Sequence, residues 1–125
     1  MTEVPDGTEP RIVADTRDLA ARVGEPGEIG AVWNIPSGER DLDANVIALP
    51  PGEGIALHRG PAIDVLIHVV AGAGTLTTAT TDIALSPGHV VWLPRGSRRA
   101  FTAGPGGLRY LTVHQHRTPG PLLGA

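Results

Sequence analysis

The chain contains no cysteine and no lysine. Without cysteine it can form neither a disulfide bond nor a thiolate nucleophile, and a thiolate metal site is excluded as well. All ten basic residues are arginine, and apart from Arg95, Arg98 and Arg99 they are dispersed along the chain. Because the formal net charge is −3, the sequence does not indicate a nucleic-acid partner.

Long apolar segments are also lacking. The longest apolar run, Val65 to Ala73, is interrupted by His68 and is much too short to cross a bilayer as a helix. The first residues, MTEVPDGTEPR, are acidic and contain no basic segment followed by an apolar one, so they do not resemble a secretory signal. We therefore expect a cytoplasmic protein that does not bind a membrane.

The size of the chain, 125 residues and 12.9 kDa, fits one domain with a single core. Within that domain we expect three parts. Residues 1–40 form an N-terminal arm with short strands, residues 41–117 form a barrel, and residues 118–125 form an irregular tail rich in glycine and proline.

The arm contains three short segments with local structure signals. Arg11–Ala14 is predicted to be a strand because it is mostly apolar and lies between polar residues. A helical turn is predicted at Thr16–Arg22, where Asp15 or Thr16 can cap the first turn. A second strand is predicted at Ala31–Ile35.

The predicted barrel region alternates short apolar runs with clusters of glycine and proline. No stretch of it keeps the periodicity of a helix. Glycine and proline suit tight corners, because glycine tolerates positive φ and proline fixes φ. Short strands separated by such turns are typical of an all-β sandwich or barrel. The predicted strands are Asn45–Leu49, Ile55–His58, Val65–Val70, Gly74–Thr78, Val90–Leu93, Arg99–Thr102 and Leu108–His114.

A spaced pattern of glycines surrounds one histidine in PGEGIALHRGPAIDVLIHVVAGAG. Five residues separate Gly52 from His58, and six separate Val65 from Gly72. Gly60 follows His58 by two positions. Glycines at fixed intervals mark places where the backbone turns or approaches a neighbour closely. The pattern therefore indicates a strand, carrying His58, that is held between two glycine corners.

A second pattern follows in SPGHVVWLPRGSRRAFTAG. Five residues separate Gly88 from Pro94, Gly96 comes two positions later, and Arg99 three positions after that. Together the two patterns resemble the paired motifs of the cupin superfamily, over about residues 42–116. The resemblance implies an all-β fold, the cupin-type double-stranded β-helix or jelly-roll barrel, which encloses a cavity.

The resemblance covers the spacing of the motifs but few of their metal ligands. A cupin metal site uses two or three imidazoles and a carboxylate. His58 keeps its ligand position, whereas Gly60 and Val65 offer no donor, and Arg99 places a permanent cation at the last ligand position. We therefore expect no metal and no other cofactor. A substitute metal site would need other donors, and those available are Asp64, His68, His114 and His116.

His58, Asp64 and Arg99 are expected to lie close together at the mouth of the barrel. A buried arginine needs a partner, because an unpaired buried charge is very costly. On one interpretation Asp64 pairs with Arg99 and the ion pair fills the vacated metal site. On the other, Arg99 and His58 bind an anionic ligand. The residues leave both interpretations open.

Four residues are candidates for contact with a bound small molecule: Asn45, Trp92, Phe101 and Arg99. Asn45 is the polar residue of an otherwise apolar strand. Phe101 lies two positions after Arg99 and shares its face of the strand. Trp92 is expected mainly to be a core residue and only secondarily to stack on a ligand.

The sequence favours a small-molecule-binding protein whose pocket, centred on His58 and Arg99, takes an anionic or carbonyl-bearing ligand. One alternative is an isomerase, epimerase or cyclase in which His58 is the general base, Asp64 orients it and Arg99 stabilises an oxyanion. Another is a metal-dependent dioxygenase or cyclase with non-standard histidine ligands. The resemblance also implies a homodimer, because in many cupins a segment like residues 11–40 adds a strand to a neighbouring subunit.

Overall fold

The structure, a computed structural model, describes residues 9–116. The predicted tail at 118–125 and the first eight residues of the predicted arm lie outside the described residues. The described part folds into one short helix and seven strands. Their bounds are α1 Thr16–Ala21, β1 Gly30–Asn34, β2 Leu42–Leu49, β3 Gly54–Arg59, β4 Val65–Thr78, β5 Asp82–Leu85, β6 Val90–Leu93 and β7 Arg98–Gln115.

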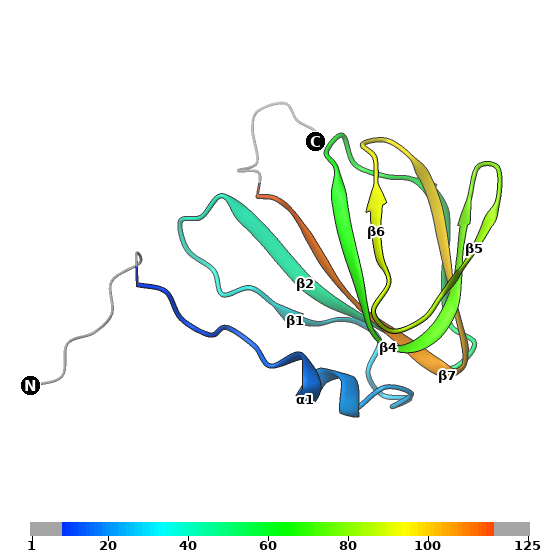
Figure 1. Cartoon of the computed structure of the whole chain (residues 1–125), viewed down its shortest axis with the longest axis horizontal. Helices are drawn as coiled ribbons and strands as arrows, with labels where there is room; N and C mark the ends of the chain where they lie inside the picture. Colours follow the sequence, from blue (N-terminus) through cyan, green and yellow to red (C-terminus); the bar gives the residue numbers. More distant parts are fainter. Residues whose placement is uncertain (1–8, 117–125) are drawn as a thin grey trace, which may run out of the picture.

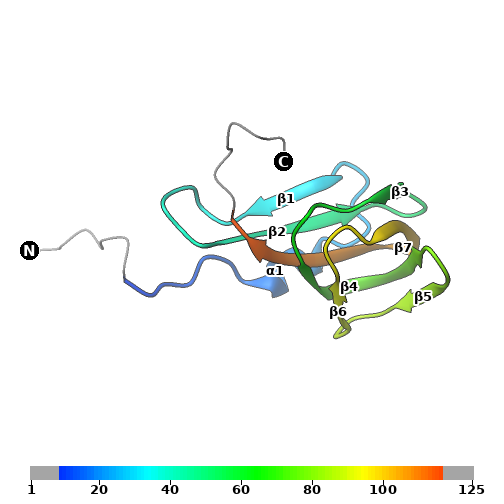
Figure 2. The same cartoon turned by 90° about the horizontal axis from the view of Figure 1, so that it is seen from above.

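Two long strands, β4 and β7, run antiparallel to each other (Figure 1). The fold has two facing walls, and each of these strands belongs with one half to one wall and with the other half to the other. The first half of β7 pairs with β3 and with the second half of β4, whereas its second half pairs with β2 and with the first half of β4. β1 extends the sheet beyond β2, and β5 and β6 pair with opposite halves of β4. β7 thus contributes residues to both walls (Figure 2).

Alternation along β4 decides which of its side chains enter the core. Val65, Ile67 and Val69 are buried, while the intervening Leu66 is 46% exposed. This period of two is that of a strand with one face on the core. The buried apolar residues of the facing walls form one cluster, made of Leu49, Val65, Ile67, Val69, Leu76, Leu85, Leu93, Phe101, Ala103, Leu108 and Tyr110.

β7 passes from one wall to the other where three glycine backbones meet. Gly72 on β4 is aligned with Leu108, but Gly74 is aligned with Ala103, so β7 has extra residues between these two positions. Gly72 and Gly107 both have positive φ, 77° and 84°. A Cβ on Gly72 would overlap the carbonyl of Gly107, and one on Gly107 would lie 2.8 Å from the backbone nitrogen of Gly24. The crossing therefore depends on the absence of side chains.

We expect Gly72→Ala to lower the free energy of unfolding by about 2 to 4 kcal/mol, because backbone strain at positive φ adds to the overlap with the Gly107 carbonyl. Gly88→Ala is the matched control, since Gly88 has a φ of 94° but nothing within 4 Å of an added Cβ. The control should cost only about 1 to 2 kcal/mol. Urea denaturation of both variants measures the difference, and equal losses would contradict the close-packing argument.

The outer face of the sheet is covered on one side by α1 and the segment that follows it. Of the two caps that the sequence allowed, Asp15 is the one that caps the helix. Arg109 on β7 is 1% exposed. Its Nη1 donates to the carbonyl oxygen of Leu19 at 3.0 Å, and its Nη2 lies 2.6 Å from Oε1 of Glu28. These bonds fasten the N-terminal segment to the barrel.

The contacts of Glu28 should make stability depend on pH. Hydrogen bonds from Arg22 and Arg109 lower the pKa of Glu28 from 4.5 to about 2. A carboxyl group whose pKa is lowered by folding stabilises the protein above its unfolded pKa, and this contribution disappears as the pH falls through the folded value. We therefore expect Glu28→Gln to lower the Tm at neutral pH.

The difference in Tm between wild type and Glu28→Gln should shrink as the pH falls from about 4.5 toward about 2, since the protonated glutamic acid then resembles glutamine. Thermal denaturation followed by circular dichroism across this range measures it. A difference that stays constant down to the lowest pH would show that the Glu28 charge does not hold the segment.

The strands predicted for the barrel region are recovered, but two pairs of them are continuous, as β4 and β7, because glycine allows the backbone to shift register without a chain-reversing turn. β5 was not predicted, since its four residues include only a short apolar run. The predicted strand at Arg11–Ala14 is wrong. Ile12 is 91% exposed and these residues have no regular structure; the carbonyl oxygen of Val13 accepts instead from Nε1 of Trp33 at 3.2 Å.

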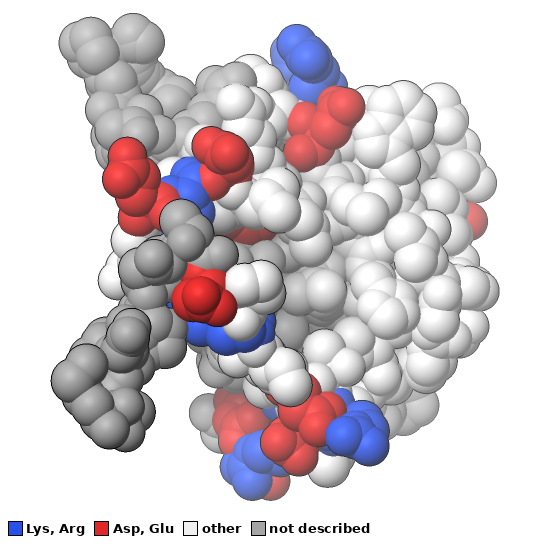
Figure 3. All heavy atoms as spheres, turned by 60° about the vertical axis from the view of Figure 1, so that its left-hand side comes forward, with Lys and Arg blue, Asp and Glu red and all other residues white. Residues whose placement is uncertain are grey.

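Charged side chains form small mixed clusters on the surface. Figure 3 shows arginine beside aspartate and glutamate at the margins of one face, and a broad area without charge between them. Two of the ion pairs are Arg17 with Asp15 and Arg40 with Asp43. The described residues of this face form no basic stripe of the kind that follows a nucleic-acid backbone (Figure 3). In residues 9–116, no helix has both the length and the apolar composition needed to cross a membrane.

Candidate functional site

A bulge in β3 directs both Ile55 and His58 into the barrel. Ile55 is aligned with Phe101 and His58 with Arg99, so three steps along β3 match two along β7. Strict alternation would place Ile55 and His58 on opposite faces, because an odd number of steps separates them. With the extra residue both line one pocket, while Leu57 is 51% exposed. The bulge therefore brings His58 beside Arg99.

Alternation along β7 supplies the two facing groups of pocket residues. Arg99 and Phe101 come from its first half, in the wall shared with β3. Tyr110, Thr112 and His114 come from its second half, in the wall shared with β2. Because the strand crosses between the walls at Gly107, residues of a single strand face one another across the pocket.

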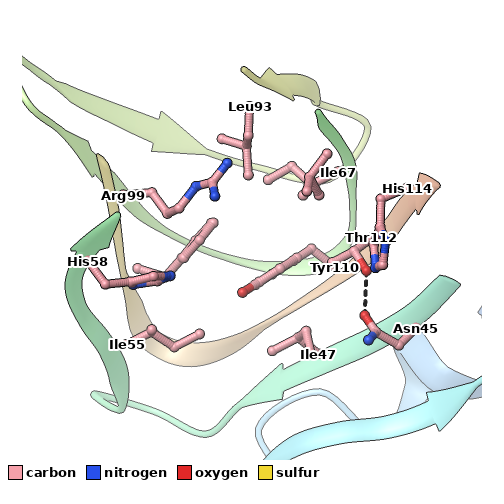
Figure 4. A pocket seen from close by; sticks show the side chains of 12 residues that line it. Asn45, Ile47, Ile55, His58, Ile67, Leu93, Arg99, Tyr110, Thr112 and His114 are labelled. Carbon is pink, nitrogen blue, oxygen red and sulfur yellow. Dashed lines mark hydrogen bonds between the residues drawn. The ribbon is translucent and has the colours of Figure 1, made fainter. Parts of the chain in front are cut away.

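The pocket has a volume of about 250 Å³ and a largely apolar wall. Figure 4 shows Arg99 and His58 on one side and Asn45, Thr112 and His114 on the opposite side. A small apolar cavity with a few polar groups is the usual form of a ligand site. Its lining residues are Asn45, Ile47, Ile55, His58, Val65, Ile67, Leu93, Arg99, Phe101, Tyr110, Thr112 and His114.

Arg99 is 3% exposed, and it lines the pocket as predicted. Its Nε and Nη2 are buried and have no hydrogen-bond partner among the described residues. The guanidinium fills the space that a side chain at position 60 would take, since a Cβ on Gly60 would overlap Nη1 and Cζ of Arg99. Gly60 therefore makes the room in which Arg99 lies.

Asp64 does not pair with Arg99, so that interpretation of the sequence is wrong. Asp64 is exposed, and its Oδ1 accepts the backbone N–H of Arg95 at 2.9 Å. β4 begins only at Val65, which leaves Asp64 in the preceding loop, where a backbone donor satisfies its carboxylate. Arg99 is consequently a buried cation without a carboxylate partner in residues 9–116.

The imidazole of His58 is oriented by its own strand. Its Nδ1 lies 2.9 Å from the carbonyl oxygen of Ala56. Because a carbonyl only accepts, Nδ1 donates, and in the neutral ring Nε2 is then an acceptor. The ring is exposed at the mouth of the pocket. The predicted orienting role of Asp64 is therefore wrong, and the Ala56 carbonyl takes that place.

Tyr110 and Phe101 stack across the pocket floor, with ring centroids 4.7 Å apart and an angle of 18° between the rings. Burial raises the pKa of Tyr110, although the positive charge of Arg99 opposes the shift. The phenol is therefore a neutral donor, and Figure 4 shows its hydroxyl pointing toward the side that holds His58. Burial lowers the pKa of Arg99 below its usual value, but an arginine remains charged at neutral pH.

Trp92 lies outside the pocket, which contradicts both predictions made for it. Its side chain is 63% exposed, and it is aligned with Leu66 on the outer face. Leu93 is buried and lines the pocket, so alternation turns Trp92 outward. Asn45, by contrast, lies in the pocket wall as predicted, and its Oδ1 accepts the hydroxyl hydrogen of Thr112.

Tyr110 and Thr112 are pocket residues that the glycine and proline motifs do not indicate. The signal that identifies them is the segment YLTVHQH, in which every second residue shares a face. Once His114 is placed inside the barrel, Thr112 and Tyr110 must follow it. Spacing alone does not say which of the two faces of this segment is interior.

The residues at the ligand positions of the cupin motifs do not fit a divalent cation. The side chains at Gly60 and Val65 have no donor atom, and the guanidinium of Arg99 occupies the space beside Gly60 with a positive charge of its own. His58 alone cannot replace the hydration shell of a metal ion. A cation at this place would be repelled by Arg99.

The histidines considered as substitute ligands do not converge. His114 lines the pocket, whereas His116 lies beyond the end of β7, with its Nδ1 3.5 Å from Oδ2 of Asp43. His68 alternates with the inward Ile67 and is absent from the pocket lining, as expected for an outward residue. Across residues 9–116, no three His, Asp or Glu side chains are grouped so as to hold a metal ion.

We expect the purified protein to contain transition metal well below stoichiometry and to gain little thermal stability from added iron, manganese, nickel or zinc. The reason is the lack of converging donors together with the charge of Arg99. Elemental analysis by mass spectrometry and thermal denaturation with each metal are the measurements. Stoichiometric metal that is lost in His58→Ala or His114→Ala would contradict this expectation.

Solved structures show which fold the chain has. The chain is similar to a cupin-2 domain containing protein from Shewanella frigidimarina, with a TM-score of 0.66 and 14% identity over 83% of this chain and 95% of that one. It is also similar to the cupin domain of Cnp3 from Schizosaccharomyces pombe, with a TM-score of 0.60 and 17% identity over 68% of this chain, although it spans only 63% of that chain. The chain therefore has the cupin fold, as the sequence motifs predicted.

An enzyme is among the similar structures. The polyketide cyclase RemF from Streptomyces resistomycificus matches with a TM-score of 0.61 and 23% identity, over 78% of this chain and 77% of that one. No protein-family profile matches the sequence, and no curated protein matches it. At these identities the likeness concerns the fold, and the function must be argued from the site.

Proposed function

We propose that this protein binds a small organic anion, and that Arg99 holds the acidic group of that ligand inside the barrel. The observation that carries the proposal is the buried guanidinium of Arg99, in which Nε and Nη2 find no hydrogen-bond partner within residues 9–116. A buried charge without a partner is strongly unfavourable. A carboxylate or phosphonate in the pocket would supply the missing countercharge and acceptors.

The geometry of the guanidinium suits an oxyanion. Nε and one terminal nitrogen of an arginine form a fixed fork, which can donate two parallel hydrogen bonds to a carboxylate or phosphate group. In Arg99 the two nitrogens of such a fork, Nε and Nη2, are the ones without a partner in the described part of the chain. The neutral Tyr110 hydroxyl, on the floor of the same pocket, can donate a further hydrogen bond.

The walls of the pocket restrict the size and the polarity of the rest of the ligand. Ile47, Ile67, Leu93 and Phe101 offer apolar surface around the charged group. The volume of about 250 Å³ corresponds to roughly eight water molecules at about 30 Å³ each. An acid with a compact apolar body, such as a substituted aromatic ring, is the class of ligand that this pocket fits.

Isothermal titration calorimetry with benzoate, phenylphosphonate and benzamide tests the proposal. Benzoate or phenylphosphonate should bind at least about tenfold more tightly than neutral benzamide, because only the acids form charge-assisted hydrogen bonds. Arg99→Met should abolish this preference without lowering the Tm, since it removes an unpaired buried charge. The matched control is Arg98→Met, because Arg98 is exposed on the opposite face of the same strand.

Gly60→Ala gives a second variant that retains the arginine. The added methyl group would overlap the guanidinium, so the end of the Arg99 side chain must move and affinity for the acid should fall. Acid binding that is unchanged in both Arg99→Met and Gly60→Ala, or equal binding of benzoate and benzamide by the wild type, would overturn the proposal.

A second candidate is an enzyme that moves a proton on such a ligand. His58 favours it, because the bond from Nδ1 to the Ala56 carbonyl leaves Nε2 as an acceptor at the pocket mouth. For a ligand with a carbonyl group, Nε2 would take a proton from the adjacent carbon, and Arg99 would stabilise the enolate oxygen. An isomerase, epimerase or cyclase uses such a step.

Proton exchange measured by nuclear magnetic resonance tests this second candidate. Phenylpyruvate in deuterium oxide should exchange its benzylic hydrogens faster with wild-type protein than with His58→Gln. Glutamine keeps the size and polarity of the side chain but removes the basic nitrogen. An exchange rate that is equal for wild type, His58→Gln and buffer alone would overturn the enzymatic candidate and leave the binding function unaffected.

A further inference from the structure

The wall opposite Arg99 carries a second set of polar side chains, which the acidic group of the proposed ligand would not contact. Asn45 on β2 is aligned with Thr112 on β7, and His114 follows Thr112 by two positions on the same face. All three line the pocket. Figure 4 shows them together, across the cavity from Arg99. Polar side chains in a largely apolar pocket fix the orientation of a ligand.

Hydrogen bonds within this wall determine what each group can offer. The hydroxyl of Thr112 donates to Oδ1 of Asn45, which engages the amide oxygen and leaves the amide nitrogen as a donor. Nδ1 of His114 lies 2.9 Å from the carbonyl oxygen of Gln115 and therefore donates to it. In the neutral ring, Nε2 of His114 is then an acceptor. The wall combines one donor with one acceptor.

A hydroxyl group matches this combination better than other small polar groups. It accepts one hydrogen bond and donates another, so it can satisfy Asn45 and His114 together. A carbonyl oxygen only accepts and would leave His114 without a donor. A hydrogen or a methyl group would displace water from these half-buried side chains without replacing its hydrogen bonds, which disfavours binding.

We propose that Asn45, Thr112 and His114 bind a hydroxyl group of the ligand, so that the pocket selects a small hydroxy acid whose acidic and hydroxyl groups lie at opposite ends of an apolar body. This inference rests on the proposed anion site at Arg99. Ile47, Ile67 and Leu93 line the pocket along with the two polar groups and would contact the apolar body.

Calorimetric titration with matched acids tests the proposal. The pairs are 4-hydroxybenzoate with benzoate, 4-hydroxyphenylacetate with phenylacetate, and 3-(4-hydroxyphenyl)propionate with 3-phenylpropionate. They vary the separation between the two polar ends. In at least one pair, the hydroxy acid should bind about tenfold or more tightly than its partner without the hydroxyl. 4-Formylphenylacetate, which has only an acceptor, should not show this gain.

Variants test whether the tighter binding of the hydroxy acids depends on the side chains of Asn45, Thr112 and His114. Asn45→Leu combined with His114→Phe should remove the preference for the hydroxyl while keeping the affinity for the unsubstituted acid, because Arg99 is intact. Thr112→Val, which is nearly isosteric, serves if the double variant does not fold, and it should reduce the preference by freeing the amide of Asn45. The control is Gln115→Leu, at an exposed position next to His114.

The outcomes separate the two proposals. If the wild type binds the acids through Arg99 but treats every pair alike, or if the formyl compound gains as much as the hydroxy acid, the hydroxyl site is wrong and the anion site stands. A preference that persists in Asn45→Leu/His114→Phe and in Thr112→Val would also overturn the hydroxyl site. If no acid binds at any length, the anion site itself fails.

Discussion

The crossing of β7 between the two walls is the constraint on which the rest of the structure depends. It requires the backbones of Gly72 and Gly107 to approach more closely than side chains allow, and both glycines take positive φ there. One continuous strand can then place Arg99 in one wall and Tyr110 and His114 in the other. The pocket is the space between two halves of the same strand, so an error at the crossing would displace both of its polar groups at once.

Arg99 and Gly60 form a complementary pair within this pocket. The missing side chain at position 60 provides the volume that the guanidinium fills. The result is a fixed positive charge in an apolar cavity, close to the positions where cupin motifs carry metal ligands. A metal ion and a guanidinium both attract anionic groups, but they act differently. Arginine donates hydrogen bonds in a planar fork, and it neither exchanges ligands nor activates a bound water. Such a site suits recognition of an oxyanion, and it suits stabilisation of an enolate if His58 removes a proton.

Several parts of the fold and of the site were predictable because they follow from local rules. The spacing of Gly72 and Gly88 indicated places where the backbone turns or approaches a neighbour closely, and both have positive φ. Alternation from Arg99 to Phe101 placed both inside the barrel. The errors concern residues for which a local rule does not say which face of the strand is interior or which group the side chain contacts. Trp92 was assigned to the interior although its neighbour Leu93 takes that position. One of the two interpretations paired Asp64 with Arg99, but the carboxylate of Asp64 accepts instead from the backbone N–H of Arg95.

The sequence by itself determined the all-β class, most of the barrel strands, the key glycines and the loss of the usual metal donors, because these depend on residue type and on intervals along the chain. Only the tertiary structure decided which polar groups face one another. The bulge in β3 turns His58 inward against the parity of its strand, and pairing of β2 with β7 brings Asn45 to Thr112, 67 positions away in sequence. Such contacts join segments that are distant in the chain, and their geometry depends on register and bulges, which no local pattern of residues specifies.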